Sequence, residues 1–556
     1  MTTVERTPVD GSGESAGGSA PAPARDPLRW LLLALVPVPA LIALAEAVRS
    51  PRMNFNDYWA VLAKVANEDG SLRADVLLDL YNEHPITLAG PLFWLDAKFF
   101  SAYNWVLGVG NVVLVAVMLA GLVRMLPPAL TGRTRLAVVV ALSTLLFSSA
   151  ALEYFGMGMS GLHWLVGLVP AVLAIGFAQR GQTAVAAVLA VVGCFGHGSA
   201  FPVWAALAVV AWLRRDRLWQ VLLPIALGVV TVVLWLLPSR PPEYPAPTLL
   251  GADSLLSTAL AMLGQVWAAR DVEVAAVAGA VTVVFALTAL VRARLGDAPV
   301  TDSGWFGLAV HVVLVAGMVG ASRARFGNGE ALGPRYAMVA LLGAAALLVL
   351  LVVRGPVLAR RHAVPIALVF GVTAYAVGSA NAAAVRANYP KQPVLAVAMR
   401  VGALSVIESM NSTPNVIPVL KSLRAYPFTE DFSLGCGPHE LGSVIDMSQV
   451  GELPGPKGSA KTAGAVETGP VEGDAKVYGW AAVDGHAADC VLVVDSGSEV
   501  VGGGAVGLPR KDVVDTIHAT GRAGWQVVAE PGTQGGVVLV SSGGKLYRTT
   551  LVIDVE

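Results

Sequence analysis

The chain has 556 residues, of which 55% are hydrophobic and only 14% are charged. A soluble globular domain carries roughly 25% charged residues, so this composition favours a chain embedded largely in lipid. The net charge of -1 argues against a nucleic-acid binder, which shows a basic surplus. Three cysteines are too few for a disulfide scaffold, and none lies in a zinc-binding pattern.

The N-terminal residues 1–27 are rich in Gly, Ser, Ala and Pro and have no apolar periodicity. We expect them to form a disordered tail. Arginine is common and lysine scarce, with much Ala, Val and Gly, a composition typical of GC-rich bacterial genomes.

Apolar runs of about the length that a bilayer requires recur through the next 350 residues or so. They predict about eleven transmembrane helices within a core of residues 28–380. Two of the runs are short and meet at GCFGHGSAFP, so 182–213 is either one broken element or a re-entrant hairpin. The predicted spans are 29–48, 104–123, 136–152, 162–179, 182–196, 200–213, 219–237, 272–291, 305–321, 335–353 and 363–380.

The distribution of arginine predicts the orientation of these spans. If the N-terminus is cytoplasmic, the inner loops are strongly basic and the first outer loop, 49–103, is acidic or balanced, as the positive-inside rule requires. An odd number of spans then places residues 381–556 outside the cytoplasm. The inner loops hold Arg124, Arg133, Arg135, Arg180, Arg214, Arg215, Arg217, Arg292, Arg294, Arg354, Arg360 and Arg361.

The C-terminal region divides into three predicted parts. Residues 381–450 form a predicted helical region, with helical spacing over 381–425, and 451–473 form a Gly/Pro/Ala linker. Residues 474–556 change to a period of two, which predicts a small antiparallel β-sandwich. Outside the cytoplasm, Cys436 and Cys490 could form a disulfide; the alternative is two unpaired, half-buried thiols.

The first outer loop is longer than a helix connector needs to be. Its segments 57–70 and 72–81 have helical spacing with one apolar face. Asp57 lies just after the first span, beside Tyr58, and Glu83 and His84 shortly before the second. A carboxylate in this position could accept a proton from a substrate hydroxyl. Alternatively, Asp57 caps the helix that starts at Tyr58.

Two predicted outer turns combine polar side chains with glycines. EYFGMGMSGLHW contains Glu153 and His163, and GHGSAF contains His197. These side chains could line a polar cavity, on the substrate side, together with the first loop; a single histidine in such a place can equally be structural.

A predicted outer loop, SRARFGNGEALGPRY, carries Arg323, Arg325 and Arg335, followed by Tyr336. Arginine near the bilayer is costly to insert, and guanidinium groups separated by glycines suit bidentate recognition of phosphate. We therefore expect a lipid phosphate or pyrophosphate on these residues. The alternative is that they snorkel to headgroups or pair with Glu330.

Several catalytic signatures are absent from the sequence. It has no Walker lysine loop, no GxGxxG that opens a helix after a strand, no HExxH and no GxSxG elbow. Nothing therefore points to ATP, a dinucleotide or a serine hydrolase.

The long first loop with FNDYW and NEHP, the R-x-R-x-G…RY pattern and the helical core resemble the GT-C superfamily of integral-membrane glycosyltransferases. The resemblance implies a polyprenyl-phosphate-sugar donor and an acidic base in the first outer loop, which would be Asp57. The site shows NDYW, with one acid and not the paired acids of many members, so a divalent metal is left open. The β-sandwich resembles modules that could hold an acceptor glycan, here through Trp480 and Trp525.

We therefore expect a glycosyltransferase at the outer face of a bacterial plasma membrane. It would transfer a sugar from a polyprenyl-phosphate donor to a cell-envelope glycan or lipid acceptor, among membrane lipids. The alternatives are a transporter or flippase of a lipid-linked or anionic solute, and a non-catalytic envelope scaffold. A transporter should carry polar residues in the middle of several spans, whereas this chain places most ionisable groups at span ends.

Overall fold

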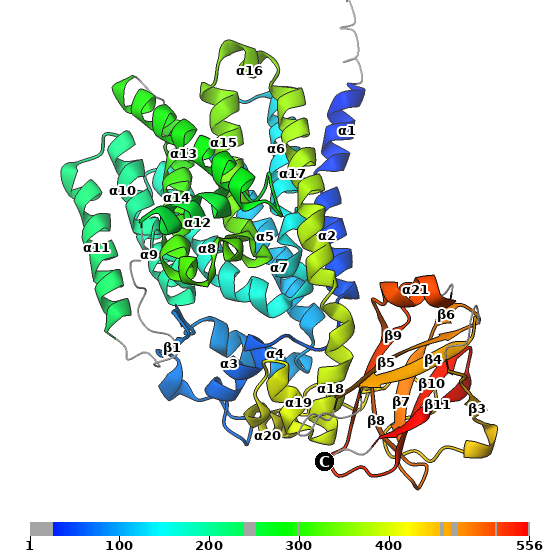
Figure 1. Ribbon diagram of the computed structural model, residues 1–556. Helices are drawn as coiled ribbons and strands as arrows, with labels where there is room; N and C mark the ends of the chain where they lie inside the picture. Colours follow the sequence, from blue (N-terminus) through cyan, green and yellow to red (C-terminus); the bar gives the residue numbers. More distant parts are fainter. Residues whose placement is uncertain are drawn as a thin grey trace, which may run out of the picture.

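The computed structural model describes residues 26–237, 252–296, 300–455, 461–468, 476–517 and 520–553. A bundle of apolar helices forms one part and a β-rich domain the other (Figure 1). Short helices lie between them, at the end of the bundle that carries residues 50–103, which we call the loop end. The tail expected at residues 1–27 lies outside the described residues, except for Asp26 and Pro27.

The described residues include nine helical segments that are long and apolar enough to cross a membrane. Each coincides with one of the predicted spans, which confirms a polytopic helical protein. The two remaining predicted spans are helices too short for that criterion. The nine segments are Pro27–Arg49, Asn104–Met125, Gly132–Gly156, Gly158–Gln179, Leu218–Leu236, Val272–Leu295, Val300–Phe326, Pro334–Arg354 and Ala363–Val401.

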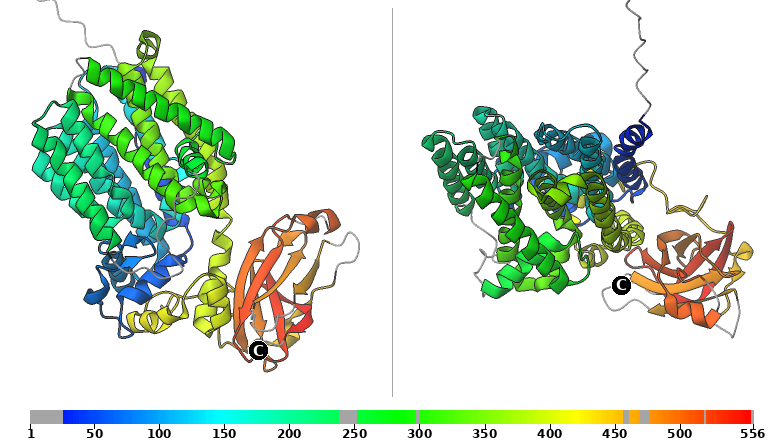
Figure 2. Two further views of the ribbon diagram at one scale, coloured as in Figure 1. Left: turned by 60° about the vertical axis from the view of Figure 1, so that its left-hand side comes forward. Right: turned by 90° about the horizontal axis from the view of Figure 1, so that it is seen from above.

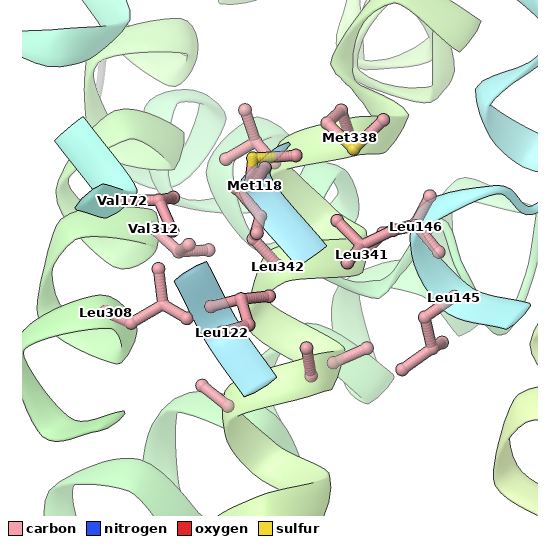
Figure 3. Close-up of a cluster of buried hydrophobic side chains, with 14 of the residues drawn as sticks. Met118, Leu122, Leu145, Leu146, Val172, Leu308, Val312, Met338, Leu341 and Leu342 are labelled. Atoms are coloured by element: carbon pink, nitrogen blue, oxygen red, sulfur yellow. The ribbon is translucent and has the colours of Figure 1, made fainter. Parts of the chain in front are cut away.

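The most deeply buried long helix of the bundle is α15. Its Leu341 and Leu342 pack among Met118 and Leu122 of α5 and Val312 of α14 (Figure 3). Burial of such side chains stabilises a fold by about 1.5–3 kcal/mol each in water, whereas in lipid close packing itself supplies the stabilisation. The helices of the bundle are α1 (Pro27–Leu35), α2 (Val38–Arg49), α5 (Asn104–Met125), α6 (Gly132–Leu146), α7 (Leu152–Gly156), α8 (Gly158–Gln179), α9 (Thr183–Gly196), α10 (Val203–Leu213), α11 (Leu218–Leu236), α12 (Ala252–Gly264), α13 (Val272–Leu295), α14 (Ser303–Arg323), α15 (Ala337–Arg354), α16 (Val357–Arg361) and α17 (Ala363–Arg386).

The uncertain segment 182–213 forms a hairpin of two short helices, α9 and α10. The chain reverses at His197, which contacts the loop end through the ring of His84, 4.0 Å away between centroids. Arg214, just after α10, donates to the carbonyl of Gln179 before α9, at 2.6 Å. The turn of the hairpin therefore lies at the loop end of the bundle, and its open end, near Gln179 and Arg214, lies at the opposite end. Helix α12 was not predicted, because Ser257 and Thr258 interrupt its short apolar run.

The first loop folds into a compact layer. Its helices α3 and α4 bury Tyr58, Trp59 and Phe93 in one hydrophobic core with α18–α20. The helix predicted at 57–70 exists in shortened form, as α3. The helix predicted at 72–81 is wrong: this stretch holds one turn of 3-10 helix and the first strand of a short hairpin. The elements are α3 (Asp57–Val65), η1 (Ala74–Val76), β1 (Leu80–Tyr81), β2 (His84–Pro85), α4 (Ala89–Phe100), α18 (Gln392–Val401), α19 (Leu404–Ser409) and α20 (Ile417–Leu423).

The β-rich domain is one nine-stranded sheet, with order β3-β11-β10-β7-β8-β9-β5-β4 and β6 paired to β5. All pairs are antiparallel except β3 with β11. The sheet curls until β4 and β11 contact each other, so the predicted antiparallel character holds but two separate sheets do not form. The strands are β3 (Gly451–Glu452), β4 (Ala463–Thr468), β5 (Lys476–Val483), β6 (His486–Ala487), β7 (Cys490–Val494), β8 (Val500–Leu508), β9 (Gly524–Ala529), β10 (Gly536–Ser542) and β11 (Lys545–Ile553); one helix, α21 (Lys511–Ile517), follows β8.

Two boundaries in the C-terminal half need correction. The linker predicted at 451–473 contains strands β3 and β4, and part of it lies outside the described residues. The helical region predicted at 381–450 ends with α20; only a single 3-10 turn, η10 (Met447–Gln449), follows in that range. The β-rich domain lies against α18, as the turned views show (Figure 2).

The side chains singled out in the β-rich domain have clear positions. Cys436 and Cys490 are joined by a disulfide, with 5.5 Å between their Cα atoms. Trp480 and Trp525 are only 5% and 1% exposed. Both rings belong to the core of the domain, so the expectation that they stack on a glycan is wrong.

Candidate functional site

The site forms where a turn of the first loop enters the bundle. Strands β1 and β2 pair through Tyr81 and His84 and present Glu83 at the tip of their turn. Asn82 takes a positive φ of 53° there, a conformation that asparagine tolerates. The indole of Trp235 holds the turn by donating to the carbonyl of Glu83 at 2.8 Å.

The carboxylate of Glu83 lies between Arg323, at the end of α14, and Arg325, in the 3-10 turn η5 (Ala324–Phe326) that follows. Its oxygens are 3.6 Å from Nη2 of Arg323 and 3.7 Å from Nη2 of Arg325. Both distances exceed the 2.7–3.2 Å of an N–H···O hydrogen bond, so these are charge contacts only. Among the described residues, Oε1 of Glu83 and Nε of Arg325 have no hydrogen-bond partner. Arg323 also donates from Nε to the hydroxyl of Tyr336, at 3.1 Å.

Three histidines from separate elements meet beside this ion pair. The rings of His84 and His197 stack at 4.0 Å, and that of His163 lies 4.9 Å from His197 and 5.5 Å from His84. Gly167 of α8 allows the approach, since a Cβ there would lie 2.7 Å from Cβ of His197. Burial, and then the neighbouring His163 and Arg323, hold the pKa of His84 well below its usual range, so this imidazole is neutral at pH 7.

The hydrogen bonds of His197 define its tautomer. Its Nδ1 accepts from the backbone N–H of Ser199 at 3.1 Å and lies 2.9 Å from the Ser199 hydroxyl. A neutral ring that accepts at Nδ1 carries its proton on Nε2. In the described part of the chain this buried Nε2 has no partner, so His197 presents a free donor, as Arg325 does at Nε.

Two carboxylates and the third arginine form a second group nearby. Asp57 is exposed and accepts from the hydroxyl of Tyr81 at 3.2 Å. Glu153 is half-buried and accepts from Ser160 at 2.7 Å. The charge of Asp57 acts on both Glu153 and Arg335, while Arg335 itself pairs with Glu330 at 3.4 Å.

The structure thus separates the predicted site residues into two groups. Tyr336 connects them, because its hydroxyl accepts from Arg323 while the guanidinium of Arg335 lies over its ring. Helix α3 begins at Asp57 with Asn56 as its N-cap, so Asp57 is not the cap that the sequence also allowed. Tyr58 belongs to neither group: it is buried and hydrogen-bonded to Asp96 at 2.7 Å.

A cavity of about 250 Å³ lies against Glu83, His84 and His197. Its remaining walls are mostly apolar and include Trp164, Trp235 and the face of α14 around Val319. A second cavity of about 270 Å³ shares Phe201 and Trp235 with the first and lies along α9 and α11. The polar end of this space and its apolar continuation would suit a lipid with an anionic headgroup.

Several contributors were missed from the sequence. Tyr81 and Trp164 are neighbours of Glu83 and His163 in the quoted segments, and their aromatic character was the available signal. Ser199 lies within the GHGSAF turn. Trp235, at the end of α11, gave no signal, because its role depends on α11 meeting the first loop.

No ready metal site accompanies these groups. Within the described ranges, no set of three or more His, Cys, Asp or Glu side chains is arranged to hold a metal ion. The divalent metal that the sequence left open therefore has no prepared ligand set in those parts of the chain.

Comparison of the chain with family models, with characterised proteins and with solved structures finds no match.

Proposed function

We propose that this protein transfers a sugar from a polyprenyl-phosphate donor to a cell-envelope glycan or lipid acceptor at the outer face of a bacterial plasma membrane. The donor phosphate lies on Arg323 and Arg325, and its polyprenyl chain extends along the apolar cavities. Arg335 and Tyr336 border the site on the side of Asp57.

The observation that carries this proposal is a pair of unused donors, one on the wall of the apolar cavity and one on an arginine that contacts its wall residue Glu83. Nε of Arg325 and Nε2 of His197 lack partners among the described residues. Buried donors without acceptors cost free energy, roughly 1–3 kcal/mol each, and an anionic ligand relieves that cost. Glu83 satisfies the arginine charges only through long contacts, so a phosphate with shorter hydrogen bonds competes with it.

Asp57 acts as the base in this scheme, because it is the carboxylate of the two groups that is exposed to an incoming acceptor. Its orientation is held by Tyr81. The acceptor hydroxyl oxygen attacks the anomeric carbon, and its proton moves to Asp57. The bond from the anomeric carbon to the phosphate oxygen breaks with its electron pair, and the charge that develops on the lipid phosphate is stabilised by Arg323 and Arg325. In-line displacement inverts the anomeric centre.

We infer an orientation with a cytoplasmic N-terminus and an external loop end and β-rich domain. The arginine-rich loops at the opposite end of the bundle support it. The disulfide between Cys436 and Cys490 supports it too, since disulfides persist mainly outside the reducing cytoplasm.

The lipids that co-purify with the protein test the substrate class. We expect mass spectrometry of the extracted lipids to find a polyprenyl phosphate or its sugar ester in the wild type, and much less in Arg325→Ala. The variant Arg270→Ala, which changes an exposed arginine, is the control. Only bulk phospholipids in all three samples would contradict the proposal.

A further inference from the structure

A further cavity at the loop end is separate from the site described above. It measures about 530 Å³ and lies where the bundle, α18 and the β-rich domain meet. Arg49 comes from the end of α2, Tyr389 from the 3-10 turn η8 (Tyr389–Lys391), Gln392 from the start of α18, and Asp489 from the turn before β7. Its volume falls within the range of about 300–1,000 Å³ that small-ligand sites occupy.

Two buried polar groups on its wall have no partner among the described residues. Gln392 is only 5% exposed and its Oε1 accepts no hydrogen bond. The hydroxyl of Tyr389 is also buried without a partner. An unsatisfied buried polar atom is rare in a native fold and indicates a ligand or an ordered water.

The remaining lining is balanced in charge and partly apolar. Arg49 and Asp489 offer one charge of each sign, and Arg52 is already paired with Asp431 at 3.2 Å. The rings of Tyr389 and Tyr426 and the side chain of Pro393 supply flat apolar surface. A phosphate would require a surplus of positive charge, whereas a saccharide offers hydroxyls to both kinds of hydrogen-bonding group and C–H faces to rings.

Tyr389 also connects this cavity to the candidate site. Its hydroxyl lies so close to Gly156 that a Cβ there would be 1.7 Å away, and Gly156 ends the helix that bears Glu153. Its ring lies 6.3 Å from that of Phe55, just before Asp57 in the sequence. Tyr389 therefore lies between this cavity and the segments that carry Glu153 and Asp57.

We propose that this cavity binds a short stretch of an uncharged saccharide, with Gln392 as its main hydrogen-bonding group and the ring of Tyr389 as an apolar surface beside it. That the saccharide is the acceptor of the transfer rests on the proposed function; the binding itself does not.

The test is saturation-transfer NMR on the full-length protein in nanodiscs, with neutral linear tetrasaccharides of hexoses and of pentoses added one at a time. We expect at least one to bind saturably. Gln392→Ala should weaken its binding at least tenfold, and Tyr389→Ala, which removes the ring, several-fold. Gln534→Ala, an exposed glutamine on the β-rich domain, should leave it within twofold.

Because Gln392 is buried, Gln392→Ala could lose binding through a folding defect. Arg49 also lines the cavity but is exposed, so Arg49→Gln tests the cavity without that complication. It should weaken binding at an unchanged melting temperature. Absence of binding by every tetrasaccharide, equal binding by wild type, Gln392→Ala and Arg49→Gln, or displacement by a short-chain phosphatidylglycerol would overturn the inference. Asp57→Asn should retain saccharide binding; a protein that binds the saccharide but never turns over donor would contradict the transferase alone.

Discussion

The carboxylate of Glu83 lies 3.6 Å from the guanidinium of Arg323, which joins the first loop of the protein to the end of α14. Both side chains are largely shielded from water, and Arg325 approaches the same carboxylate. In the proposed site the carboxylate of Glu83 neutralises the two guanidinium groups until a phosphate replaces it.

Glu83→Gln tests this role. Without the carboxylate two partly buried guanidinium groups lose their counter-charge, so we expect a loss of stability of up to about 3 kcal/mol. Addition of polyprenyl phosphate should restore the melting temperature, and more strongly than in the wild type, because no carboxylate competes. If the variant has the melting temperature of the wild type and polyprenyl phosphate raises it no further than in the wild type, Glu83 does not compete with phosphate for the arginines.

The two arginines on Glu83 should differ from Arg335, which pairs with Glu330. We expect Arg325→Ala to weaken binding of polyprenyl phosphate at least tenfold, and Arg325→Lys to rescue it poorly, because an ammonium cannot reproduce the planar donor pair. Arg335→Ala should have a smaller effect. Binding can be measured by native mass spectrometry, and equal losses in all three variants would indicate a general effect of charge.

The buried carboxyl group of Asp96 should make the stability of the folded protein depend on pH. Burial raises its pKa to about 7, although the hydroxyl of Tyr58 donates to it. The native state therefore binds this proton more tightly than the unfolded chain, whose Asp pKa is about 3.9. Its contribution to stability is full below about pH 4 and is lost as the pH rises to about 7.

Asp96→Asn should remove this loss and be more stable than the wild type above pH 7, by on the order of 4 kcal/mol at most. Buried neutral His84 has the opposite effect, since the unfolded chain takes up its proton first on acidification. That effect is present in both proteins and cancels in their difference. The melting temperatures of the two proteins can be compared from pH 4 to pH 8. A difference between them that stays constant over this range would contradict the prediction.

The parts of the fold that depend on hydropathy could be predicted from the sequence. Long apolar runs need no tertiary information, and the nine long apolar helices among the described residues all fall on predicted spans. Helix α12 and the β1–β2 hairpin were missed, because each is short and is stabilised by contacts with distant segments. Several site residues could be predicted from their residue types and positions, but the contacts between them could not. Glu83 meets Arg323 only because the first loop enters the bundle. Trp480 and Trp525 show the reverse error, since aromatic character alone cannot distinguish a binding surface from a core.

The inferred orientation can be tested with single cysteines on exposed positions. A cysteine at Ser496, in the β-rich domain, should react with an impermeant maleimide in intact cells. A cysteine at Gln182, between α8 and α9, should react only after lysis. The native Cys194 is buried and the other two cysteines are joined, so the background is low. The reverse pattern would place the candidate site in the cytoplasm.

The most direct test of the transferase is turnover of a radiolabelled polyprenyl-phosphate sugar by the purified protein with a cell-envelope glycan fraction as acceptor. We predict sugar transfer by the wild type and a fall of roughly 10²–10⁴-fold in Asp57→Asn, because positioned general-base catalysis contributes that much. Donor binding and melting temperature should stay unchanged. Asp75→Asn, an exposed aspartate of the same loop, should be fully active. Equal turnover by Asp57→Asn and Asp75→Asn would show that Asp57 is not the base, and absence of transfer by the wild type with every donor sugar would contradict the proposed function.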